Sequence, residues 1–111
     1  MFKSMIWTVG FLDQAAEAEL LSLPRDMRAK FEHIVHLIEN FGLERVREPY
    51  VKHLEGALWE IRLSGRDGIA RSLYLTASGK RVIIVRTFRK KTQKTPRSEI
   101  NLALMRAKEL K

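Results

Sequence analysis

The sequence predicts one small α+β domain, an antiparallel β-sheet packed against a helical hairpin. A strand-like segment precedes two helical segments, the second half changes to the alternating pattern of strands, and a last helical segment follows. A chain of 111 residues is long enough for one hydrophobic core and too short for two. We therefore expect residues 1–111 to form a single domain in the order β-α-α-β-β-β-α.

The first half predicts a strand and the helical hairpin. Met5–Val9 is rich in β-formers, and Asp13 precedes the helix-forming segment Ala15–Leu23 as a candidate cap. Pro24 limits that helix and suits the start of the next one, which Gly42 ends. Apolar residues of this second helix recur at three- and four-residue steps, at Met27, Phe31, Ile34, Val35, Ile38 and Phe41.

The second half predicts a meander of three strands. Residues 58–63 alternate, which places Trp59, Ile61 and Leu63 on one face and Glu60 and Arg62 on the other. Further strands follow at Ile69–Leu75 and Arg81–Phe88, each preceded by a turn. We interpret residues 44–55 as one long connection.

A last helix is predicted after the strands. Thr95 is expected to cap it and Pro96 to occupy its first position. Its apolar residues follow helical spacing at Ile100, Ala103, Leu104 and Ala107.

Composition and missing motifs exclude several classes of function. The chain has no cysteine, which excludes disulfides, thiolate catalysis and cysteine-ligated zinc. It has no run long enough to cross a bilayer and no Walker-type loop, zinc-protease motif or carboxylate cluster for magnesium. We therefore expect a cytoplasmic protein with no membrane partner, no metal and no cofactor.

The charge is concentrated in one segment. Between Lys80 and Arg97 the chain has eight basic residues and no acidic one, which equals the whole formal net charge of +8. Outside this segment acidic and basic residues are equal in number. The eight are Lys80, Arg81, Arg86, Arg89, Lys90, Lys91, Lys94 and Arg97. Such a patch predicts a polyanionic partner.

Alternation predicts that cations from neighbouring strands meet on one sheet face. Glu60 and Arg62 share a face, and Arg71 enters from the next strand, although its apolar neighbours of equal parity require a bulge or a half-exposed face. At the end of the following strand, residues of one parity also carry charge or an aromatic ring, namely Arg86, Phe88 and Lys90.

This arrangement suits RNA cleavage without a metal. The RNA's own 2′-hydroxyl attacks the adjacent phosphorus, while cations stabilise the developing charge. For proton transfer, the residues leave two candidates open, Glu60 and a lysine whose pKa is lowered by neighbouring cations. Phe88 either stacks a base or packs in the core at a strand end.

The same residues resemble a known family. The strings Leu58–Arg62, Ala70–Tyr74 and Phe88–Pro96, with Glu99, Ile100 and Ala103 behind them, resemble the RelE/ParE toxin superfamily and its HigB-like, phage-related branch. The lead-in Pro49–Leu54 resembles the loop that this branch has before its Leu-Trp-Glu strand.

The resemblance implies a RelE-like fold and the toxin of a type II toxin–antitoxin system that cleaves messenger RNA on the ribosome. Its partners would be the ribosome, messenger RNA and a cognate helix-turn-helix antitoxin, with DNA reached only through the antitoxin. By position, the catalytic set is Arg62, Arg71 and Lys90 with Glu60, where some relatives have lysine. The expected RNA contacts are Phe88, Arg86, Arg89, Lys91, Lys94 and Lys52.

Two other functions stay open. A ParE-like toxin would inhibit gyrase without cutting RNA, because one fold hosts both activities. A non-catalytic nucleic-acid-binding module would use the cations for phosphates alone and bind with a steep salt dependence.

Overall fold

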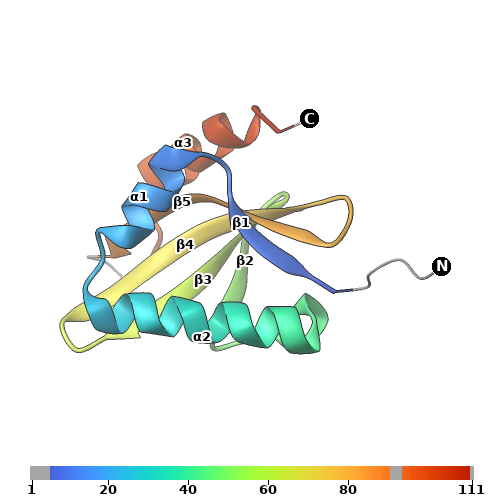
Figure 1. The fold of residues 1–111 in the computed structure, drawn as a ribbon. Coiled ribbons are helices and arrows are strands. Elements are labelled where there is room, and N and C mark those ends of the chain that lie inside the picture. Colours follow the sequence, from blue (N-terminus) through green and yellow to red (C-terminus); the bar gives the residue numbers. More distant parts are fainter. Residues whose placement is uncertain (1–5, 91–93, 111) are drawn as a thin grey trace.

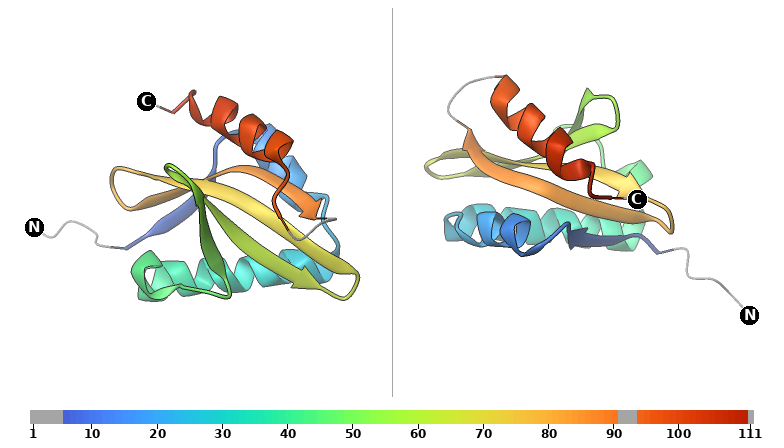
Figure 2. Two further views of the ribbon diagram at one scale, coloured as in Figure 1. Left: turned by 180° about the vertical axis from the view of Figure 1, so that it is seen from behind. Right: turned by 90° about the horizontal axis from the view of Figure 1, so that it is seen from above.

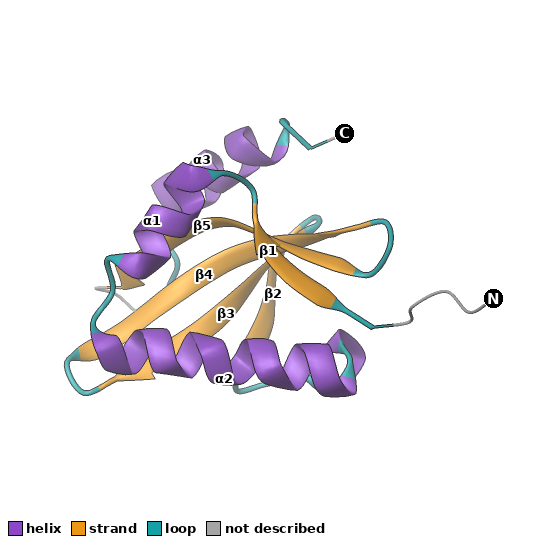
Figure 3. Ribbon diagram, in the orientation of Figure 1, coloured by secondary structure: helices purple, strands orange, loops and turns teal. Residues whose placement is uncertain are grey.

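The computed structural model describes residues 6–90 and 94–110, which form a five-stranded sheet with helices on both faces (Figures 1 and 3). The strands are β1 (Thr8–Phe11), β2 (Val51–Glu55), β3 (Leu58–Gly65), β4 (Gly68–Ala77) and β5 (Arg81–Lys90). The helices are α1 (Gln14–Leu21), α2 (Arg25–Phe41), the 3-10 turn η1 (Leu43–Arg45) and α3 (Arg97–Ala107). The predicted α+β class is confirmed.

The sheet is mixed, so its description as antiparallel was incomplete. The strand order is β1-β5-β4-β3-β2. Strands β2 to β5 form an antiparallel meander, whereas β1 runs parallel to β5, with Thr8 opposite Arg81 and Phe11 opposite Ile84. This pairing joins segments far apart in the sequence, and local alternation carries no information about it.

Strand β2 lies inside the segment that we had interpreted as a connection. Val51 pairs with Ile61 and His53 with Trp59 in an antiparallel ladder. This strand carries no apolar alternation, because Lys52 and His53 are both exposed at the sheet edge. Its position at the edge of the sheet is important for the site described below.

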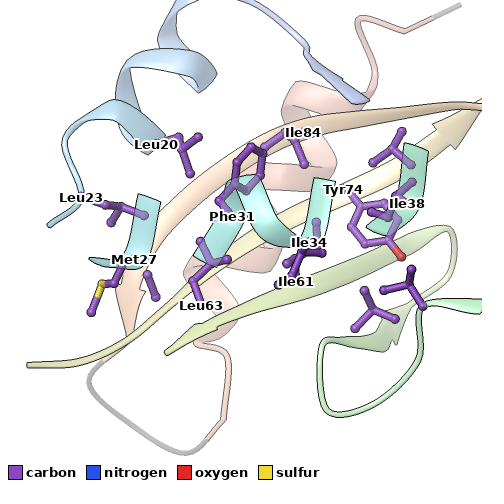
Figure 4. Packing of buried hydrophobic residues seen from close by; sticks show 14 residues of the cluster. Leu20, Leu23, Met27, Phe31, Ile34, Ile38, Ile61, Leu63, Tyr74 and Ile84 are labelled. Carbon is purple, nitrogen blue, oxygen red and sulfur yellow. The ribbon is translucent and has the colours of Figure 1, made fainter. Parts of the chain in front are cut away.

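Each face of the sheet has its own hydrophobic cluster. Helices α1 and α2 cover one face, and α3 covers the other (Figure 2, right). On the first face, Phe31 and Ile34 of α2 pack against Ile61 and Leu63 of β3 (Figure 4). On the second, Ile100 and Ala103 of α3 join Leu58, Leu73, Ile83, Val85 and Phe88. The predicted helical hairpin therefore packs on the sheet as expected.

The helix ends agree with prediction except at α3. The Asp13 side chain accepts a hydrogen bond from the Ala16 amide at 2.9 Å, and Gly42 ends α2 with a φ of 90°. At α3, Pro96 occupies the cap position and no side chain caps the helix. Thr95 therefore does not cap the helix. Its hydroxyl bonds to Glu60 at 2.7 Å instead.

The edge of β5 has no strand partner beyond the end of β1, and side chains satisfy its backbone there. Glu19 on α1 accepts a hydrogen bond from the Thr87 amide at 3.2 Å, and Arg106 on α3 donates to the Val85 carbonyl at 2.8 Å. Burial alone would raise the pKa of Glu19, but hydrogen bonds from Arg106 and Thr87 and the charge of Arg86 lower it. Because these side chains occupy its backbone groups, this part of β5 is protected from the addition of another strand.

Within the described residues, no helix has both the length and the apolar character needed to cross a bilayer.

Candidate functional site

The register of the sheet brings the two predicted arginines side by side. Arg62 on β3 lies opposite Arg71 on β4, and Ile69 on β4 lies opposite Lys90 on β5. Directly opposed residues project from the same face of a sheet. This is the face that carries α3, because Leu73, two residues after Arg71, packs in the α3 cluster. Residues that share the parity of Arg71 are apolar where α3 covers this face, as at Leu73. Beyond α3 the same face is polar, which explains why Arg71 lies on it.

These side chains line a groove of about 610 Å³ at the edge of the sheet. Its wall combines cations from β3, β4 and β5, which the sequence predicted to meet, with cations from β2, from α2 and from the segment before α3. We call this surface the cationic groove. Its basic residues are Lys30, Lys52, Arg62, Arg71, Lys90 and Lys94, and its other lining residues are Pro49, Tyr50, Ser64 and Ile69.

Glu60 lies buried beside the cationic groove with no exposed surface. One carboxylate oxygen accepts a hydrogen bond from Arg71 Nη1, and the other accepts one from the Thr95 hydroxyl at 2.7 Å. Arg71 Nη1 also donates to Thr95 Oγ1 at 3.1 Å, while Arg62 Nε lies 3.7 Å from Glu60 Oε2. Glu60 therefore fixes both arginines and the chain segment before α3.

The electrostatics of the cationic groove act most clearly on Lys90. Burial and the positive charges of Arg71, Arg62 and Lys52 lower the pKa of Lys90, with Glu60 acting in the opposite direction. An excess of cations around one amine favours its neutral form and also favours a bound anion. The concentration of positive charge therefore suits the binding of a phosphate.

Three predicted RNA contacts lie away from the cationic groove. Arg86 pairs with Glu99 at 2.7 Å and with Glu19 at 2.8 Å, so its charge is used to join β5 to both flanking helices. Phe88 is 8% exposed in the α3 cluster, and its ring lies 5.9 Å from the Arg86 guanidinium. The base-stacking alternative for Phe88 therefore has no support in this arrangement, and the core alternative describes it.

Arg89 projects from the opposite face and donates to the Asp67 carbonyl at 3.1 Å, in the turn between β3 and β4. It is separated from Lys90 because neighbouring residues of a strand alternate between faces. Lys91, another predicted contact, lies outside the described residues.

Among the lining residues of the cationic groove that were not predicted are a cation, Lys30, and an aromatic residue, Tyr50. Lys30 belongs to α2, which we had assigned only to the core, and it reaches the groove past the sheet edge that β2 leaves open. Tyr50 stands in the lead-in that the family resemblance singled out, but we interpreted that lead-in as a connection. The available signal was the resemblance itself, because Tyr50 lies within the lead-in Pro49–Leu54.

A larger hollow, of about 830 Å³, lies on the other side of β2. Trp7, Trp59 and Tyr74 line it together with both apolar and charged side chains, and burial raises the pKa of Tyr74 to about 12. It shares Lys52 with the cationic groove but contains no comparable gathering of cations, so we assign the candidate site to the smaller groove. Among the residues that the structure describes, no group of three or more acidic or histidine side chains is placed to hold a metal ion.

Comparison with known proteins identifies the family of the chain. The family model for phage-derived proteins of the Gp49-like type matches residues 18–108, a span that includes every residue of the cationic groove. No curated protein matches the chain. The Gp49-like family is one of RelE/HigB-like toxins, which agrees with the resemblance at superfamily level. Since the match covers most of the sequence, the chain belongs to the Gp49-like family of phage-derived proteins.

Proposed function

We propose that this protein is the toxin of a type II toxin–antitoxin system and an endoribonuclease that cleaves messenger RNA on the ribosome. The observation that carries the proposal is the convergence of cations from four strands, a helix and a loop in one groove. Membership of a toxin-like family supports it. We further propose a HigB-like toxin acting in the cytoplasm, with a helix-turn-helix antitoxin as its partner.

The reaction that fits the cationic groove is transesterification within the RNA. The 2′-oxygen forms a bond to the adjacent phosphorus as the bond to the 5′-oxygen breaks, which leaves a 2′,3′-cyclic phosphate and a 5′-hydroxyl. Neutral Lys90 takes the proton of the 2′-hydroxyl, and water entering the open groove protonates the leaving 5′-oxygen. Protonated Lys90 then returns its proton to the hydroxide that is left, which restores the neutral amine and the water. Arg62 and Arg71 stabilise the extra negative charge on the phosphorus oxygens.

Lys90 fits the proton-transfer role better than Glu60. The lowered pKa of Lys90 increases its neutral fraction near neutral pH. Both oxygens of Glu60 already accept hydrogen bonds, and its side chain has no exposed surface from which to reach RNA. We assign Glu60 as a positioning residue for Arg71.

The test is induction of the protein in growing bacteria, followed by mapping of messenger 5′ ends. We expect new ends within translated codons, and we expect Arg62→Gln or Lys90→Gln to lower their yield about a hundredfold. Lys108→Gln is the matched control, because Lys108 is an exposed cation outside the cationic groove. It should cut like the unaltered protein.

Other outcomes identify the competing functions. Intact messages together with altered DNA supercoiling would assign the protein to the gyrase-inhibiting class. Growth arrest with intact messages and unchanged supercoiling would leave nucleic-acid binding without catalysis. Equal loss of cleavage in all three variants, including Lys108→Gln, would show that the cationic groove has no special role in cleavage.

A further inference from the structure

Cleavage by a 2′-hydroxyl requires the RNA strand to be held with its bases splayed, and proteins commonly hold an unpaired base on an aromatic ring. Phe88 does not offer its ring, because it is packed beneath α3. Among the described residues that line the cationic groove, Tyr50 is the aromatic one. This inference rests on the proposed function and concerns how the same site holds its substrate.

The backbone of Tyr50 is fixed on both sides. Its amide donates to the Arg47 carbonyl at 2.9 Å, and its carbonyl accepts from the Arg62 amide at 2.8 Å. The second bond ties Tyr50 directly to the strand that carries one of the proposed catalytic arginines. A base held at Tyr50 would therefore be positioned relative to Arg62 by the sheet itself.

The ring of Tyr50 is also held. It meets the His33 ring of α2 edge-on, with centroids 6.4 Å apart and planes at 68°, and it packs against the α2 cluster while remaining partly exposed. A ring oriented by packing loses little conformational entropy when it binds a ligand. Lys30 and Lys52 line the same groove, where they can take the phosphates on either side of a bound base.

We propose that Tyr50, with Lys30 and Lys52, forms a subsite for one unpaired nucleobase of single-stranded RNA at the sheet edge. The ring provides the stacking surface and the two lysines bind the flanking phosphates. Because stacking accepts any base, this subsite positions the strand and leaves base selection to other contacts.

The test uses a dye-labelled, fully 2′-O-methylated oligonucleotide, which the proposed reaction cannot cut, and a series in which one position at a time lacks its base. Fluorescence anisotropy should show one position where loss of the base weakens binding about tenfold or more. Tyr50→Leu should weaken binding of the intact oligonucleotide by a similar factor and add nothing when that base is absent. Tyr50→Phe, which keeps the ring, should behave like the unaltered protein.

Phe41→Leu is the matched control, because Phe41 is an exposed aromatic residue of α2 that does not line the cationic groove. A second measurement needs no substitution: an iodouracil placed at the sensitive position should crosslink to Tyr50 on irradiation. The subsite is overturned if the unaltered protein does not distinguish intact from abasic oligonucleotides. It is equally overturned if Tyr50→Leu weakens all of them alike, if Tyr50→Phe loses the discrimination, or if the crosslink maps elsewhere.

These outcomes are independent of catalysis. Base-dependent binding at Tyr50 by a protein that leaves messages intact would refute the proposed function and keep the subsite. Cleavage that needs Lys90 but proceeds normally in Tyr50→Leu would keep the proposed function and refute the subsite.

Discussion

Three side chains decide the geometry of the site at the residue scale. Arg71 is only 6% exposed and bonds to Glu60, and both bond to the hydroxyl of Thr95. A buried guanidinium needs a compensating carboxylate, since removal of one partner of a buried ion pair costs about 3–5 kcal/mol. Thr95 belongs to the segment between β5 and α3, so this triad also connects that segment to the floor of the cationic groove.

Removal of the Thr95 hydroxyl should loosen the site without dismantling the fold. Thr95→Val leaves Glu60 Oε1 and Arg71 Nη1 each short of one bond, and we expect a loss of about 1–3 kcal/mol in the free energy of unfolding. RNA cleavage should fall about tenfold or more, because small errors in position are costly in catalysis. Denaturant unfolding and single-turnover cleavage measure the two effects.

Thr95→Ser is the control, because it keeps the hydroxyl and should restore both quantities. Normal cleavage by a destabilised Thr95→Val would show that the triad supports the fold alone.

At the element scale, α2 and the hairpin of β3 and β4 depend on a close approach at Gly65. A Cβ placed on Gly65 would lie 2.8 Å from the Asp26 carboxylate and 2.8 Å from Met27 Cγ. Asp26 bonds to the Arg66 amide at 2.5 Å, and this bond is the first cause of the lowered pKa of Asp26. The start of α2 is thus joined to the turn that sets the register of Arg62 with Arg71.

Gly65→Ala should therefore lower the free energy of unfolding by about 1–3 kcal/mol, because the added methyl group would overpack the contact with buried Met27. Gly10→Ala in β1 is the matched control, because a Cβ there meets nothing within 4 Å. It should be neutral or slightly stabilising. Equal unfolding midpoints for the two variants in urea would show that α2 moves aside without cost.

Sequence patterns predicted the elements whose apolar spacing is local and missed those that depend on distant partners. Helix α2 and strand β3 carry clear periodicity, so they were predicted to within a few residues. Strand β2 has no such alternation, and the parallel pairing of β1 is decided by the far end of the chain. The parity argument correctly placed Arg62, Arg71 and Lys90 on one face.

Strand alternation does not predict where ion pairs and helices occupy that face. Arg86 has the parity of Lys90, but Glu99 and Glu19 neutralise it, and α3 covers Phe88. Lys30 joins the cationic groove from a helix on the other face, by passing the short edge strand. Contacts of this kind follow from packing and have no signature in the local sequence.

At the scale of the whole molecule, folding divides the basic run of Lys80–Arg97. Arg86 and Arg97 form ion pairs, the latter with Glu55 at 2.6 Å, and their charges are used within the fold. Lys90 and Lys94 face the cationic groove, where Lys30, Lys52, Arg62 and Arg71 come from outside the run. The surface proposed to bind RNA is therefore assembled from six segments of chain, and the charged run supplies only part of it.

The most direct test of this account is the chemistry of the cut ends on ribosomes programmed with a defined message. Purified protein should cut the all-ribose message, leaving a 2′,3′-cyclic phosphate upstream and a 5′-hydroxyl downstream. The same message with a single 2′-deoxynucleotide at the cut position should stay intact there. Cleavage at the deoxynucleotide, or a downstream fragment that carries a 5′-phosphate, would contradict the account.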